Sequence, residues 1–218
     1  MTKKTDASRP RYDEGCLAVH ALNQIGDRWA LLVVRELMFT PKRFQMIRAG
    51  MPGITAGVLT ARLAQLQDVG VVTHDESLGV YALTQAGVGL LPVLEALCRW
   101  ALTIPGHDPS RFISPTALMI SMGVNLQRRL VQVSEVAAGF DFGREAFEAD
   151  IADGGLRVRA VSQPNTPFVL KADGNTMAIA IYGTAPLSHL ITDGVIGAQG
   201  DIVAAQNFVN LFQLEPQI

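Results

Sequence analysis

The first hundred residues carry apolar positions at helical spacing, interrupted by short polar turns. Capping residues and glycines mark where each helix begins and ends. Two short apolar runs around a polar turn, within residues 71–83, instead predict a two-stranded hairpin. The predicted helices are Cys16–Ile25, Arg28–Phe39 with Asp27 as its cap, Arg43–Ala49, a helix from Thr55 to Gly70, and a long helix from Thr84 to Leu102 that Pro92 bends.

The helix that begins at Thr55 has two unlike faces. Leu59, Leu63 and Leu66 recur at helical spacing and predict a buried side. The opposite face carries small or short residues, where a solvated helix usually carries long polar ones. Because small side chains let another surface come close to the backbone, this is either an ordinary buried helix or a helix that contacts a partner. The residues of this face are Gly57, Thr60, Ala61, Ala64 and Asp68.

The second half of the chain follows a different pattern. Ser114-Pro115 predicts the start of a helix that runs to about Val131. Residues 155–161 alternate apolar and basic side chains and predict a half-exposed strand, and residues 167–183 predict a hairpin with Asp173-Gly174 in its turn. Residues 185–194 and 201–212 predict two helices. Strands and helices in separate blocks are typical of an α+β fold.

A segment rich in proline, Thr103–Pro115, separates the two patterns. We therefore predict a first domain at residues 1–103, a linker at 104–114 and a second domain at 115–218. Residues 1–103 carry 11 Lys and Arg against 9 Asp and Glu, whereas residues 104–218 carry 7 against 11. The mildly basic first part of the chain and the acidic second part suggest different partners for the two domains.

Composition and motifs exclude several classes of protein. The two cysteines, Cys16 and Cys98, cannot form a disulfide framework, and the polar residues 1–11 are not a signal peptide. No run of about 18 apolar residues occurs, so we expect a cytoplasmic protein without a membrane segment. Cys16 and His20 do not complete a metal site, and nucleophile-elbow, phosphate-loop and dinucleotide motifs are missing. We therefore expect no enzyme activity, cofactor or metal.

The order of helix, helix, turn, helix and hairpin is that of a winged helix-turn-helix. In this motif the second helix of the pair enters the major groove of DNA with its N-terminal residues leading. The small-residue face of the helix from Thr55 to Gly70 would then lie against base pairs. The candidate residues for this contact are Thr55, Ala56, Gly57, Thr60 and Ala61.

Over about residues 12–102 the chain resembles the HxlR-type winged-helix transcriptional regulators. The resemblance implies a homodimer that binds a pseudo-palindromic double-stranded DNA operator, usually through packing of terminal helices. The matching positions are Cys16, Ile25, Gly26, Arg28, Trp29, Arg43, Phe44, Ile47, Ile54, Leu59, Thr60, Arg62, Leu63, Tyr81, Leu83, Thr84 and Gly87. The apolar residues suited to the dimer interface are Leu90, Leu91, Leu94, Leu97 and Trp100.

The chain departs from the family pattern at two places. Gly57 stands where the family often has Arg or Lys, and the hairpin turn, or wing, carries Asp75 and Glu76 without a basic residue. Since phosphate contacts dominate affinity for DNA, an acidic wing is expected to repel the backbone. The phosphate contacts then fall to Lys42, Arg43 and Arg48, to Arg62 or the basic N-terminal arm, with His74 of the wing as a further candidate. Arg62 has an equal claim to a buried structural ion pair.

The second half resembles the sterol-carrier-protein-like fold that is appended to some regulators of this type. The resemblance covers about residues 115–218 and implies a curved mixed sheet, with helices over an apolar cavity that binds a small apolar or aromatic effector. Any one of the predicted pocket residues could instead be an ordinary core residue, which is the commoner case. They are Phe142, Phe147, Phe168, Leu170, Met177, Ile179, Ile181, Leu187 and Leu190.

The sequence thus predicts an α+β protein with a mostly helical winged helix-turn-helix domain and an α+β ligand-binding domain. The leading hypothesis is a dimeric transcriptional regulator controlled by a small effector. A second hypothesis is a regulator that senses oxidants or electrophiles through Cys16. A third is a small-molecule carrier that has lost DNA binding, which the acidic wing and Gly57 would favour.

Overall fold

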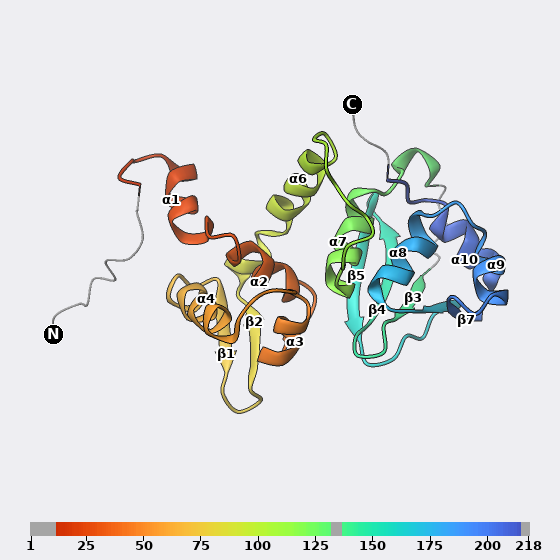
Figure 1. Cartoon of the computed structure of the whole chain (residues 1–218), viewed down its shortest axis with the longest axis horizontal. Coiled ribbons are helices and arrows are strands. Elements are labelled where there is room, and N and C mark those ends of the chain that lie inside the picture. The colour runs from red at the N-terminus through yellow and green to blue at the C-terminus, as the bar shows by residue number, and fades with distance from the viewer. Residues whose placement is uncertain (1–11, 132–136, 215–218) are drawn as a thin grey trace.

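The structure, a computed structural model, describes residues 12–131 and 137–214. A helical half and a half built around a sheet lie next to each other (Figure 1). The elements of the helical half are α1 Leu17–Ile25, α2 Ala30–Glu36, α3 Phe44–Ala49, α4 Ala56–Asp68, β1 Val72–Asp75, β2 Val80–Leu83, α5 Gln85–Val88 and α6 Leu91–Ala101. Among the described residues, no helix is long and apolar enough to cross a membrane.

Helix α4 forms as its sequence predicts. The Thr55 hydroxyl accepts a hydrogen bond from the backbone N–H of Val58 and so caps the first turn. Beyond the last turn, Gly70 has φ +73°, a left-handed conformation that favours glycine. The leucines of the predicted inner face are buried in the core of the helical half. The small-residue face is therefore the outer one.

The prediction of one long helix from Thr84 to Leu102 is wrong. The chain instead forms α5, capped by the Thr84 hydroxyl, and a separate helix α6 with Pro92 in its first turn. Proline lacks a backbone N–H. This loss is tolerated in the first turn of a helix, where the N–H groups have no carbonyl partner within the helix. Pro92 therefore begins a helix here and does not bend one.

The predicted wing is confirmed as an antiparallel pair of strands, β1 and β2. A further strand-like bridge extends it, because Lys42 and Tyr81 exchange two backbone hydrogen bonds of 2.9 Å. The segment between α2 and α3 is thereby attached to the wing. The position of Lys42 is set by this pairing and is important for the site described below.

The C-terminal half is a mixed five-stranded sheet in the order β5-β4-β3-β6-β7, in which β3 and β6 run parallel and the other neighbouring pairs antiparallel. Helices pack against this sheet, so the predicted α+β class is confirmed. Its elements are α7 Pro115–Val124, a 3₁₀ turn Arg128–Leu130, β3 Ala138–Asp141, β4 Ala146–Ala152, β5 Gly155–Val161, β6 Phe168–Lys171, α8 Gly174–Tyr182, α9 Leu187–Thr192, β7 Gly197–Gly200 and α10 Ile202–Val209.

The predicted hairpin across Asp173-Gly174 is wrong. Strand β6 is followed directly by helix α8, and the Asp173 carboxylate accepts a hydrogen bond from the Thr176 N–H as a helix cap. Aspartate favours both turns and helix starts, so the local signal did not separate the two. The spacing of Met177 and Ile181, four residues apart and both buried, is that of one helix face.

Other boundaries also differ. Helix α7 ends at Val124, short of the predicted Val131, and α2 ends at Glu36, short of Phe39. Phe147, a predicted pocket residue, lies in strand β4, which the sequence did not predict. Strand β5 and helices α9 and α10 agree with the predicted segments.

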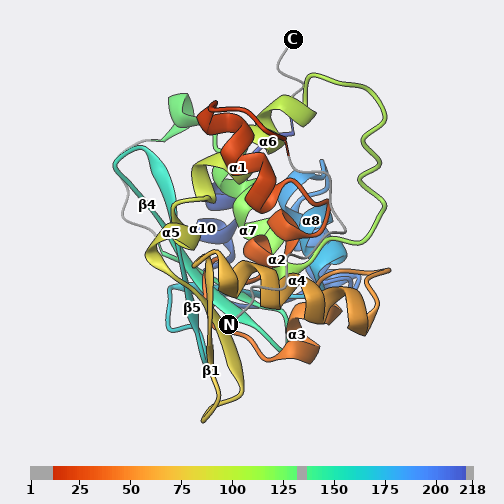
Figure 2. The same cartoon turned by 90° about the vertical axis from the view of Figure 1, so that its left-hand side faces the viewer.

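Two apolar cores lie side by side and are in contact. Ile120 of α7 belongs to the core of the helical half, and Phe39 packs against both cores. Residues 102–114 run from α6 to α7 as a long loop along one edge of the molecule (Figure 2). The boundaries at 103 and 115 stay a prediction, since α7 packs against α2 and α6 as well as against its own sheet.

Candidate nucleic-acid interface

The outer face of α4 is open to solvent. Its leading residues are exposed, while Leu59 and Leu63 between them are buried. A β-carbon at Gly57 would meet no atom within 4 Å, so the space beside this glycine is open. The exposed predicted contact residues are Thr55, Ala56, Gly57, Thr60 and Ala61.

The two threonines of this face present different groups. The Thr55 hydroxyl is occupied as the helix cap. The Thr60 hydroxyl donates to the carbonyl oxygen of Ala56 at 3.0 Å, within the helix. This bond uses the only proton that the hydroxyl can donate, whereas the Thr60 methyl group has no such constraint. Thr60 is therefore better suited to an apolar contact than to donating a hydrogen bond.

Of the predicted basic contacts, Arg43 and Arg48 are exposed. Arg43 precedes the first residue of α3 and Arg48 lies in its last turn. Both side chains are therefore open to solvent and accessible to an anionic partner. The basic segment 1–11, also predicted as an arm for DNA, lies outside the described residues.

The prediction that Lys42 contacts phosphate is contradicted by its position. Its side chain is 0% exposed, and its ammonium lies 3.3 Å from Oε2 of Glu36 and 2.5 Å from Oε2 of Glu145. It also donates to the Thr116 hydroxyl at 2.9 Å. The ammonium has three donors and three partners, so a phosphate could bind it only by disrupting a buried network.

Arg62 had two possible roles, and its position favours the structural one. Its guanidinium is buried and lies 3.1 Å from Oδ2 of Asp27, and it also donates to the Gln65 side chain. Gln65 in turn donates to the Gln24 backbone carbonyl at 2.8 Å. Arg62 thus joins α4 to the segment before α2 and is not on the outer face.

The wing tip is acidic but internally hydrogen-bonded. The Asp75 carboxylate accepts from the Ser77 hydroxyl and from the backbone N–H groups of Ser77 and Leu78. These bonds lower the pKa of Asp75, so its charge persists at neutral pH. His74 is half-buried and stacks on Tyr81, with ring centroids 4.2 Å apart. A charged wing of this kind is poorly suited to lying against phosphates.

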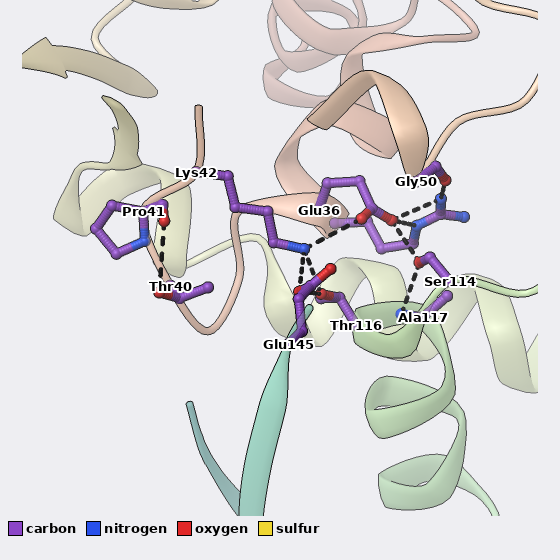
Figure 3. A network of polar contacts seen from close by, with 10 residues as sticks. Glu36, Thr40, Pro41, Lys42, Gly50, Ser114, Thr116, Ala117 and Glu145 are labelled. Atoms are coloured by element: carbon purple, nitrogen blue, oxygen red, sulfur yellow. Dashed lines mark hydrogen bonds and ion pairs between the residues drawn. The ribbon is translucent and has the colours of Figure 1, made fainter. Parts of the chain in front are cut away.

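A buried polar network joins the two halves (Figure 3). Oε1 of Glu36 accepts from the Ser114 hydroxyl at 2.6 Å, and Oε2 pairs with Lys42. Ser114 also caps α7, and Thr116 lies in its first turn. Glu145, immediately before β4, completes the network through Lys42. Sequence reasoning missed this cluster because its members are far apart along the chain and carry no motif.

Gly50 closes the other side of this network. Its carbonyl oxygen accepts from the Arg35 guanidinium at 2.9 Å, and Arg35 also pairs with Glu36. A β-carbon at Gly50 would lie 2.1 Å from Oε2 of Glu36. The absence of a side chain at position 50 is therefore required for Glu36 to occupy this buried position.

The predicted pocket residues form a packed core. Six are buried in a single cluster, and Phe142 and Leu190 pack against its edge. Ile179 is the exception, with 57% of its surface exposed on the outer side of α8. The six buried residues are Phe147, Phe168, Leu170, Met177, Ile181 and Leu187. Their burial indicates a structural role for most of the set.

The two cysteines lie in opposite environments. Cys16 is exposed and precedes α1, and hydrogen bonds from the backbone N–H groups of Val19 and Ala18 lower the pKa of its thiol. Cys98 lies in α6, and burial raises the pKa of its thiol. The thiolate is the reactive form of cysteine, so Cys16 is the more reactive of the two at neutral pH.

Comparison with known proteins gives a family match for the helical half. The model of the HxlR-like helix-turn-helix family matches residues 24–107. An uncharacterised HTH-type transcriptional regulator of Methanothermobacter thermautotrophicus is 33% identical over 98 residues, which are 43% of this chain and 75% of that protein. The quinone-bound structure of YodB from Bacillus subtilis is 33% identical and covers 38% of this chain and 91% of its own, with a TM-score of 0.35.

A structure described as the UbiJ-SCP2 ubiquinone synthesis protein matches a larger share of the chain. It covers 56% of this chain and 91% of its own, at 17% identity and a TM-score of 0.34.

Proposed function

The chain belongs to the HxlR-like helix-turn-helix family of transcriptional regulators, and on this premise we propose that it is a dimer that binds operator DNA through α4. The observation that carries the proposal is the exposed small-residue face of α4, which has Arg43 and Arg48 close to it in sequence. Small residues let the helix backbone approach base edges and the groove wall closely, so recognition rests on apolar contacts and groove shape. Arg43 and Arg48 supply the phosphate contacts.

The dimer is proposed from the apolar surface of α1 and α6. Leu17 is 84% exposed and Trp100 is 60% exposed, and Leu22 and Leu97 are exposed near them in sequence. Large apolar side chains left in water on two helices favour association with a second copy. Leu94, predicted for the same interface, is instead buried in the core of its own chain, and Leu90 and Leu91 are partly buried.

Fluorescence anisotropy against the region upstream of its own gene tests the proposal. We expect specific binding that weakens steeply with salt, because phosphate contacts release counterions. Arg43→Ala or Arg48→Ala should each reduce the slope of log K against log salt by about 1. Arg99→Ala, an exposed arginine on α6 that pairs with Glu95, is the matched control and should leave the slope unchanged. Binding that does not respond to salt would contradict the proposal.

A thiol switch at Cys16 is the second candidate function, favoured by the exposure and lowered pKa of this thiol. Hydrogen peroxide would convert the thiolate to a sulfenate with release of water. The thiol switch predicts that oxidation abolishes DNA binding in the wild type and in Cys98→Ser. It predicts no such loss in Cys16→Ser. A Cys16→Ser variant that still responds to oxidant would rule it out.

The C-terminal half is proposed to bind the effector. Binding would change operator affinity by favouring one relative placement of the two helix-turn-helix halves in the dimer. As a regulator of DNA, the protein is proposed to act in the cytoplasm. If the anisotropy experiment detects no specific DNA binding while a small molecule does bind, the carrier hypothesis replaces the regulator.

A further inference from the structure

The segment between α6 and α7 encloses a pocket with the outer side of α8. The pocket has a volume of about 690 Å³, within the range of sites that bind drug-sized ligands. Residues 106–109 and 111–113, which we call the strap, form one wall, and residues 178–179 and 182–183 form the opposite wall. Ser121 of α7 and Leu214 complete the lining.

The C-terminal end of the strap is tied to α8 by one side chain. The Asn175 carbonyl accepts from the Ile113 N–H at 3.1 Å, and its amide group donates to the Arg111 carbonyl at 2.8 Å. The other end of the strap begins at Gly106, in a left-handed conformation at φ +98°, and residues 102–105 connect it to the end of α6. The strap thus connects the pocket mechanically to α6.

Apolar side chains line this pocket although they are exposed to solvent. Phe112 of the strap is 54% exposed, and Ile179 of α8 is 57% exposed. A molecule in the pocket could cover both side chains, and removing their apolar surface from water favours binding. The preferred occupant is therefore mainly apolar.

Two hydroxyl groups supply a neutral polar part of the lining, and the charged strap residues Asp108 and Arg111 pair with each other at 3.2 Å. The Ser121 and Tyr182 hydroxyl oxygens lie 2.8 Å apart, and the Asn125 amide donates to the Ser121 hydroxyl at 3.3 Å. Burial raises the pKa of Tyr182, so its phenol stays protonated at neutral pH. Such a pair can exchange hydrogen bonds with a hydroxyl or carbonyl group of a ligand.

We propose that the strap pocket, and not the packed core beside the sheet, is the effector site, and that it binds a neutral, mainly apolar small molecule with a hydroxyl or carbonyl group. Its regulatory role rests on the proposed function. Filling the pocket draws the strap onto α8 and so acts on α6, which carries the exposed Leu97 and Trp100 of the proposed dimer surface. Effector binding and dimer geometry are coupled through the strap.

Titration with Nile red, a neutral apolar dye with one carbonyl group, tests the site on the full chain without DNA. Ile179→Lys places a charge in the pocket at an exposed helix position, and should weaken saturable binding by roughly tenfold or more. Tyr182→Phe removes the hydroxyl group and should weaken binding by about two- to tenfold. Circular dichroism checks that each variant folds.

A matched control separates the strap pocket from other apolar surface. Val203→Lys changes an exposed apolar residue on α10 of the same half, outside the pocket. It should retain the affinity for dye. No saturable binding to the wild type, equal binding to Ile179→Lys, or loss in Val203→Lys would overturn the site. Because DNA is absent, failure here is distinguishable from failure to bind an operator, which the anisotropy experiment measures separately.

Discussion

The ammonium of Lys42 lies 2.5 Å from Oε2 of Glu145, and this contact joins the helix-turn-helix half to the sheet half inside the protein. The Lys42 backbone is at the same time paired with Tyr81 of the wing. A single residue therefore connects the wing, the helical core and the β3–β4 turn. Glu145 therefore cannot move away from this position without breaking its contact with Lys42.

Replacing Lys42 by methionine should destabilise the protein by about 3–5 kcal/mol, because it leaves two carboxylates near each other without their shared cation. Chemical denaturation of the full chain measures the change. Lys171→Met, which removes a partly exposed lysine 3.6 Å from Asp141, is the matched control and should cost about 0–1 kcal/mol. Equal effects of the two variants would show that the buried network contributes no more than a surface pair.

Gly50→Ala should destabilise the protein by about 1–3 kcal/mol, because the new β-carbon displaces the Glu36 carboxylate from its partners. Gly57→Ala is the contrasting variant, since its β-carbon points into open space within a helix. It should stabilise the protein by about 0.5–1 kcal/mol. Thermal unfolding of both variants shows whether each change lowers or raises the stability of the protein. A stabilising Gly50→Ala would contradict the packing described.

Thr60 is predicted to contribute its methyl group to the operator contact, because its hydroxyl proton is bonded to Ala56. Thr60→Val keeps a methyl group at the contact and should bind operator as tightly as the wild type. Thr60→Ser and Thr60→Ala should each weaken binding by about 1 kcal/mol or more if the methyl contacts a thymine. Anisotropy titrations with the three variants decide the matter. Tight binding by Thr60→Ser with loss in Thr60→Val would instead identify the hydroxyl.

Cys16 should react with iodoacetamide at lower pH than Cys98. The lowered pKa of Cys16 increases its thiolate fraction at any pH below the ordinary thiol pKa, whereas the raised pKa of Cys98 decreases it. Site-resolved mass spectrometry across a pH series gives the two rate profiles. The midpoint for Cys16 should fall below that of a free cysteine. Faster labelling of Cys98 would be inconsistent with these environments.

Local patterns determined much of the helical half. The cap at Thr55, the leucine stripe of α4 and the wing strands are each encoded by residues a few positions apart, and the structure contains all of them. Short-range hydrogen bonds and helical spacing are sufficient to predict such elements. Where one residue favours two local outcomes, as Asp173 favours a turn and a helix cap, the pattern predicted the wrong one.

Only the tertiary structure decided which charged residues are buried and which are exposed. Lys42 and Arg43 are neighbours of like charge, yet Lys42 is buried between two carboxylates and Arg43 is exposed. The burial of a charge depends on whether a partner lies opposite it, and Glu145 and Thr116 come from the other half of the chain. The same holds for the strap pocket, whose walls are distant in sequence and meet only when α8 packs beside the segment after α6.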